Sequence, residues 1–79
     1  MKIFVTLSTT LRNHVADYNP EQGLTLELES SASVRSLAEH LRLPHAEFKI
    51  VMLNGRHASL DDALADGDRV ALFPAVGGG

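Results

Sequence analysis

The last five residues of the sequence carry its most distinctive chemical group. Residues 75–79 end in Gly77, Gly78 and Gly79. Because glycine has no side chain, this segment offers only its backbone, in conformations that other residues rarely adopt, and it is slim enough to thread a narrow channel. The group left for chemistry is the Gly79 carboxylate, which is a poor electrophile until a leaving group is attached. We therefore expect residues 75–79 to form a flexible C-terminal tail.

Side chains for metal binding or nucleophilic catalysis are sparse. The chain has no cysteine, which excludes disulfides, thiolate metal sites and a cysteine nucleophile. His40 and His45 are separated by Pro44, so they do not share a helix face, and no histidine spacing matches a zinc site. The aspartates lack the spacing of an EF-hand loop and indicate a solvated turn. We expect no metal site and no catalytic residue. The residues considered are His14, His40, His45, His57, Asp61, Asp62, Asp66 and Asp68.

The composition is that of one small globular domain. The chain has 79 residues, of which 44% are hydrophobic, so its core is marginal and leaves little material for an enclosed catalytic cavity. Its net charge is −3 and its basic residues form no stripe, which argues against a nucleic-acid partner. No apolar run approaches the roughly 20 residues that span a bilayer, and residues 1–6 do not form a signal peptide. We expect a cytoplasmic protein without a membrane partner.

Two strands and a helix are expected in the first half. Residues 2–8 and 24–29 alternate apolar and polar side chains, which predicts two half-buried strands that pair antiparallel. The polar residues 9–23 between them predict a long loop. Ser33 is the best N-cap candidate for a helix whose apolar residues recur at i, i+3, i+4 and i+7, and Pro44 is expected to stop that helix.

Three shorter strands are expected in the second half. Residues 49–53 and 56–58 flank Asn54-Gly55, the preferred two-residue hairpin turn. Residues 59–64 suggest one helical turn. Residues 69–73 predict the last strand, which Pro74 is expected to end.

This order of elements predicts an α+β fold, with a mixed sheet of four to five strands and one main helix on one face. Residues 1–74 would form the domain and residues 75–79 the tail. If the first, third and last strands adjoin, alternation leaves an apolar patch on the face away from the helix, and such patches often bind partners. The residues expected to bind a partner are Phe4, Met52, Ala71, Phe73 and Pro74. The side chains expected to face the helix are Ile3, Val5, Leu7, Val51, Leu53, Val70 and Leu72.

Four segments carry a resemblance to a known family. They are Lys2–Val5, Ser33–Arg35, Leu53–Arg56 and, above all, residues 64–74 with their Asp66-Gly67-Asp68 turn ahead of the terminal glycines. Over its whole length the chain resembles the MoaD/ThiS family of sulfur carriers, which have the ubiquitin-like β-grasp fold. Within that family it looks most like the small subunit of molybdopterin synthase.

The resemblance implies a function for the tail. In this family a ubiquitin-activating-type enzyme uses ATP to adenylate the final glycine, here Gly79. A sulfur donor enzyme then supplies sulfur in place of one oxygen, and the resulting thiocarboxylate donates sulfur in cofactor biosynthesis. Gly78 would complete the family's Gly-Gly end, and Gly77 would add flexibility. The carrier itself catalyses nothing and binds no cofactor. The Phe73-Pro74 spacer favours the molybdopterin branch, in which the tail enters the catalytic subunit of a synthase.

Other functions remain open at this point. Thiamine-type sulfur delivery uses the same tail chemistry. A protein modifier would pass the activated carboxylate to a lysine, and a plain ubiquitin-like binding module would never be activated. Arg56 and Arg69 are expected near the sheet face or its rim, where they either pair with acidic groups of a partner or are simply solvated.

Overall fold

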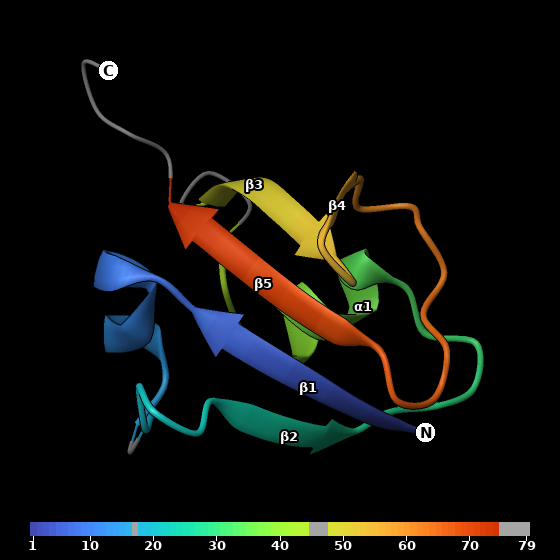
Figure 1. Ribbon diagram of the computed structural model, residues 1–79, viewed down its shortest axis with the longest axis horizontal. Coiled ribbons are helices and arrows are strands. Elements are labelled where there is room, and N and C mark those ends of the chain that lie inside the picture. Colours follow the sequence, from blue (N-terminus) through green and yellow to red (C-terminus); the bar gives the residue numbers. More distant parts are fainter. Residues whose placement is uncertain (17, 45–47, 75–79) are drawn as a thin grey trace.

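The computed structural model describes residues 1–16, 18–44 and 48–74. One twisted sheet lies in front of a single α-helix (Figure 1). The elements in chain order are β1 (Lys2–Leu7), the 3-10 helix η1 (Thr9–His14), β2 (Leu24–Glu27), α1 (Val34–His40), β3 (Phe48–Leu53), β4 (Arg56–Ala58) and β5 (Arg69–Pro74). This is the predicted α+β architecture. The expected tail, residues 75–79, and His45 lie outside the described residues.

The sheet has five strands in the order β2-β1-β5-β3-β4. β1 and β5 are parallel neighbours at its centre, and the other pairs are antiparallel, which confirms the predicted mixed sheet. The first, third and last predicted strands therefore adjoin as β1, β3 and β5.

The core lies between the sheet and α1. The inward side chains of β1 and β5 are at most 1% exposed, and Val51 is 5% exposed, as the alternation predicts. Leu53 was also expected inside but is only half-buried, because it lies at the end of β3 beside the hairpin turn. The segments outside the sheet add buried Leu11, Leu43 and Leu64.

Local hydrogen bonds define both ends of α1. Ser33 is the N-cap, as predicted: its Oγ accepts from the Ser36 N–H at 3.3 Å, and the Ser36 Oγ accepts from the Ser33 N–H at 3.1 Å. The helix ends earlier than Pro44 alone would require. Arg42 has a positive φ of 58°, and the Leu43 N–H donates to the Ala38 carbonyl at 2.9 Å, which closes the last turn.

One expectation about local structure is wrong, and another holds for a single turn only. The expected loop of residues 9–23 contains η1, which is held by the fully buried Leu11. Residues 59–64 form a single turn, closed by the Asp62 N–H donating to the Ser59 carbonyl at 3.2 Å, and no helix. The Leu60 and Asp62 carbonyls instead accept from the Arg35 and Val34 N–H groups at 2.8 and 3.0 Å. These carbonyls thus bind N–H groups in the first turn of α1, which have no hydrogen-bond acceptor within the helix.

In the part of the chain that the structure describes, no helix is long and apolar enough to cross a bilayer.

Candidate functional site

The sheet face opposite α1 carries an apolar patch built by three adjacent strands. Phe4, Ile50 and Phe73 are 42%, 39% and 36% exposed, which is unusual for side chains of this size. Strand register explains the grouping: Ala71 of β5 lies opposite Met52 of β3, and Phe73 lies opposite Ile50. We call Phe4, Ile50, Met52, Ala71 and Phe73 the open-face patch.

Four of the five predicted partner-binding residues lie in this patch, and Pro74 does not. Pro74 lies opposite Phe48, whose side chain is buried on the helix side, so alternation directs Pro74 to that side as well. Ile50 is the member missing from the prediction. The alternation that placed Val51 inside and Met52 outside would also have placed Ile50 outside, so the signal for it was present in the sequence.

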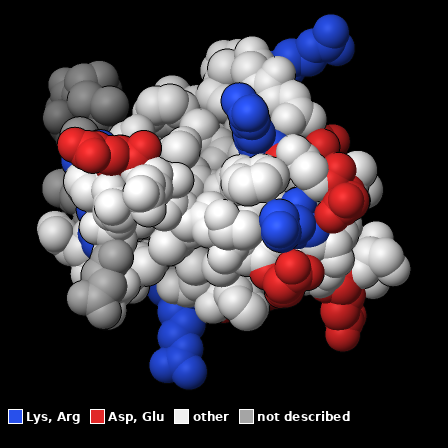
Figure 2. All heavy atoms as spheres, turned by 60° about the horizontal axis from the view of Figure 1, so that its bottom comes forward, with Lys and Arg blue, Asp and Glu red and all other residues white. Residues whose placement is uncertain are grey.

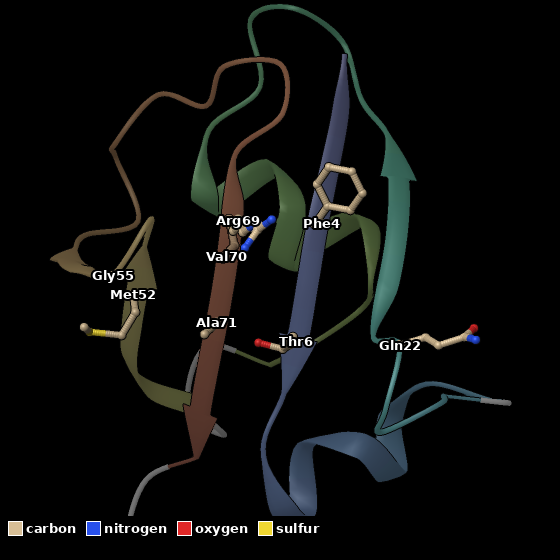
Figure 3. A pocket seen from close by; sticks show the side chains of 8 residues that line it. All are labelled: Phe4, Thr6, Gln22, Met52, Gly55, Arg69, Val70 and Ala71. Carbon is tan, nitrogen blue, oxygen red and sulfur yellow. The ribbon is translucent and has the colours of Figure 1, made fainter.

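A hollow of about 390 Å³ overlaps the patch and shares Phe4, Met52 and Ala71 with it. Its floor is low because Ala71, between Thr6 and Met52 in the register, ends at its Cβ atom. Figure 3 shows Phe4 and Arg69 on neighbouring strands at one end of the hollow, and Met52 across β5 from Thr6. The hollow is lined by Phe4, Thr6, Gln22, Met52, Gly55, Arg69, Val70 and Ala71.

Arg69 brings a positive charge to this apolar surface. Arg69 lies opposite Phe4 in the register of β1 and β5, and it is exposed. The nearest aspartates in the sequence are otherwise engaged: Asp66 accepts from the Lys2 N–H at 2.6 Å, and both carboxylate oxygens of Asp68 accept hydrogen bonds. Among the described residues, the Arg69 guanidinium has no carboxylate partner. The open face therefore presents an apolar hollow with one available guanidinium, whereas Arg56 lies on β4 opposite Leu53.

β5 connects this face to the expected tail. Leu72 is fully buried and lies between Leu7 of β1 and Val51 of β3. The Ser8 N–H donates to the Leu72 carbonyl at 3.1 Å. This bond holds β5 two residues before its last residue, Pro74. Residues 75–79, with Gly77, Gly78 and Gly79, would continue from this fixed strand but lie outside the described residues.

A second cluster secures the end of β1 beyond the reach of β2. The Leu7 N–H donates to the Tyr18 hydroxyl oxygen at 2.7 Å, and the Arg12 Nε donates to the Leu7 carbonyl at 2.9 Å. The Arg12 guanidinium lies 5.9 Å from the centre of the Tyr18 ring, within cation–π range. No pattern in the sequence indicated this cluster, because its members come from what was expected to be a loop.

The described histidines considered for metal binding lie on separate elements. His14, His40 and His57 are exposed on three different elements, and in the described segments no three His, Cys, Asp or Glu side chains gather as metal ligands would. Asp62 instead accepts from the Ser59 N–H at 2.8 Å, so it stabilises a turn.

Comparison with known proteins gives the fold and the family. The model of the ThiS family matches residues 5–79. SAMP1 from Haloferax volcanii is similar in structure, with a TM-score of 0.74 and 25% identity over 100% of both chains. A putative molybdopterin converting factor subunit 1 from Pyrococcus furiosus has a TM-score of 0.73 and 27% identity over 96% of this chain and 99% of its own.

A third structure shows likeness of fold alone. The complex of subunits 1 and 2 of the molybdopterin-converting factor from Helicobacter pylori contains a chain with a TM-score of 0.63 and 20% identity over 100% of both chains. Comparison with curated protein sequences finds no match. The predicted ubiquitin-like β-grasp fold is thereby confirmed.

Proposed function

The chain belongs to the ThiS family, and on that premise we propose that it is a sulfur carrier whose Gly79 carboxylate is activated and converted to a thiocarboxylate. Membership makes it a ubiquitin-like sulfur carrier or modifier. The family match extends to residue 79 and so includes the three glycines. The observation that carries the finer proposal is the position of β5, which contributes Ala71 and Phe73 to the open-face patch and ends at Pro74, three positions before Gly77 in the sequence.

The arrangement suits a tail that must be delivered into another protein. Fixing each residue of a glycine-rich tail costs about 1–2 kcal/mol, so the folded body must supply the binding free energy. The open-face patch offers exposed apolar surface for this purpose, with Phe73 one residue from the end of β5. Because Leu72 is fixed between two strands, a partner docked on the patch would receive the tail from a defined origin.

The proposed chemistry takes place in the partner enzymes. A carboxylate oxygen of Gly79 attacks the α-phosphorus of ATP and releases pyrophosphate, which leaves an acyl adenylate. A donor enzyme then supplies sulfur at the sulfide oxidation level. This sulfur attacks the acyl carbon, the bond to the AMP oxygen breaks, and a thiocarboxylate remains. The chain is a substrate in both steps, and its own residues bind and position rather than catalyse.

We propose a molybdopterin-type synthase as the acceptor of the sulfur. The Pyrococcus relative is named as a putative subunit 1 of a molybdopterin converting factor, and the Helicobacter structure pairs such a subunit with subunit 2. By analogy, the catalytic subunit of a synthase would bind the open-face patch and admit the tail. Thiamine-type delivery is the alternative, in keeping with the name of the matching family model.

A second candidate function is covalent modification of other proteins. The likeness to SAMP1 favours it, because a further structure of this Haloferax protein is described as a small archaeal modifier protein. In that function the activated Gly79 carbonyl would pass to a lysine amine, with AMP as the leaving group, and form an isopeptide bond.

The deciding experiment is the intact mass of the chain isolated from its native cells, with fragmentation of the C-terminal peptide. The sulfur carrier gains the mass difference between sulfur and oxygen at Gly79, and incubation with ATP, a sulfur source and the host's adenylating enzyme restores this gain to unmodified protein. A variant lacking Gly78 and Gly79 is the control and must not gain it. An unmodified carboxylate under all these conditions contradicts the proposal, and adducts to lysines of other proteins favour the modifier.

A further inference from the structure

The outer edge of β2 offers unpaired backbone groups. β2 is the first strand of the sheet and pairs with β1 alone. Met1 and Leu28 exchange two hydrogen bonds, of 2.6 and 2.9 Å, which sets the alternation of this antiparallel ladder. The N–H and C=O groups of Thr25 and Glu27 therefore point away from β1. Within the described segments, no hydrogen bond occupies these four groups, so the edge can accept a further strand.

A hollow runs beside this edge, on the side of α1. Its volume is about 380 Å³, and it lies between the end of β2 and the helix. Leu28 and Ala32 give it an apolar part, and His40 contributes from α1. A strand added to β2 would point alternate side chains towards the helix side, where this hollow can receive one of them.

Two exposed carboxylates lie beside the hollow, and Lys2 lies opposite one of them, Glu27, in the strand register. Glu27 and Glu29 line the hollow, and no lysine or arginine does. The Glu27 carboxylate lies 3.9 Å from the Met1 ammonium but remains 76% exposed, and Arg35 on α1 is paired with Asp61 at 3.0 Å. Figure 2, in which this edge is turned towards the viewer, shows acidic side chains on the side where the N-terminus lies, with lysine and arginine side chains among them. Because both carboxylates are exposed and no lysine or arginine lines the hollow itself, a bound segment should be basic.

We propose that β2 binds an extended, lysine- or arginine-rich segment of a partner protein as a sixth strand. Backbone bonds to Thr25 and Glu27 would hold the segment, one alternate side chain would enter the hollow, and basic side chains would pair with Glu27 and Glu29. β5 leaves the sheet at the end opposite the N-terminus (Figure 1), and the strand register places the open-face patch on the sheet face away from α1. The segment can therefore bind while the patch and the tail engage another protein, so the inference is independent of the proposed function.

The probe is a blocked seven-residue peptide of alternating lysine and valine, added to the full chain and followed by amide hydrogen exchange in NMR spectra. At saturation, the Thr25 and Glu27 amides should exchange more slowly, because they become hydrogen-bonded. Affinity should fall as NaCl is raised. The double variant Glu27→Gln with Glu29→Gln should bind about fivefold more weakly. Because both side chains are exposed, this variant is expected to fold.

A proline variant tests the backbone contact. Thr25→Pro removes an N–H that points away from β1, so it spares the β1–β2 ladder, and it should prevent peptide-induced protection of Glu27. Thr25→Val keeps the N–H and should bind as the unchanged chain does. The proposal is overturned if the peptide does not bind, if it protects the open-face patch instead, if a glutamate–valine peptide binds equally well, or if the double glutamine variant keeps full affinity.

Discussion

Asn54 and Arg69 are joined by reciprocal hydrogen bonds. The Asn54 N–H donates to the Arg69 carbonyl at 2.8 Å, and the Arg69 N–H donates to the Asn54 Oδ1 at 3.0 Å. The Asn54 Nδ2 also donates to Asp68 at 3.0 Å. One side chain thus fastens the β3–β4 turn to the start of β5, the strand that crosses the candidate site. Asn54 has a φ of 52° and Gly55 a φ of 82°, which confirms the predicted turn.

Asn54→Ala should lower the free energy of unfolding by about 2–3 kcal/mol. The variant loses two side-chain hydrogen bonds, and alanine, unlike asparagine, has no polar side chain to stabilise a backbone with positive φ. Asn54→Gly loses the same bonds but tolerates the backbone angle, so it should cost about 1 kcal/mol less than alanine. Urea denaturation of both variants measures the difference. Equal costs would mean that the backbone angle at this position carries no strain.

Gly23 is required by a close backbone contact. Its φ is 71°, and a Cβ atom there would lie 2.6 Å from the Val5 carbonyl oxygen. Gly23→Ala should therefore cost more than about 2 kcal/mol of unfolding free energy, through strain and the displacement of β1. The matched control is Gly67→Ala: Gly67 has a φ of 86°, but a Cβ atom there would meet no atom within 4 Å, so this variant should cost about 1–2 kcal/mol. Thermal denaturation that ranks the two variants equally would contradict the contact.

The sequence predicts those features of this fold that depend on local patterns. The alternation in residues 2–8 and 69–73 assigns both central strands and their faces, and Ser33 with the following apolar spacing assigns the start of α1. The turn at Asn54-Gly55 can be predicted from these two residues alone. From these faces the sequence also predicts four members of the open-face patch, because alternation decides which side chains face away from the helix.

Features that depend on distant partners could not be predicted in this way. Residues 59–64 form one turn but no helix, because their carbonyls bond to the start of α1, which only the tertiary structure brings near. Tyr18 lies in the predicted loop, and nothing in the sequence shows that its hydroxyl oxygen accepts a hydrogen bond from the Leu7 N–H. Phe48 is buried although strict alternation from Val51 would turn it outward, because β3 has a register shift between Phe48 and Ile50 that no composition signal marks.

Phe73 and Leu72 are neighbours in sequence that should have opposite roles. Leu72 is fully buried, so Leu72→Ala should cost about 2–5 kcal/mol of unfolding free energy. Phe73 is 36% exposed, so Phe73→Ser should cost clearly less, yet it should weaken binding to the adenylating enzyme by about tenfold or more, as loss of an aromatic anchor does. Denaturation and titration calorimetry measure the two effects. Unchanged affinity in Phe73→Ser would remove this residue from the docking surface.

Arg69 should contribute charge recognition rather than stability. Its guanidinium has no carboxylate partner in the described part of the chain, so Arg69→Gln should change the free energy of unfolding by less than about 0.5 kcal/mol. If the partner presents a carboxylate to the hollow, Arg69→Glu should slow association with the adenylating enzyme more than Arg69→Gln does, and the difference should shrink at high salt. Arg56→Glu, on β4 opposite Leu53, is the matched control. Equal association rates for the three variants would mean that Arg69 is simply solvated.

The hollow over Ala71 gives a test based on shape. Ala71→Phe would place a ring in the space of about 390 Å³ without entering the core, because Ala71 points away from α1. Stability should change by less than about 1 kcal/mol, whereas affinity for the adenylating enzyme should fall by about tenfold or more, since a partner side chain can no longer enter. Ala65→Phe, exposed and outside the hollow, adds the same volume and should leave the affinity unchanged. If Ala71→Phe binds as well as Ala65→Phe, the partner does not use the hollow.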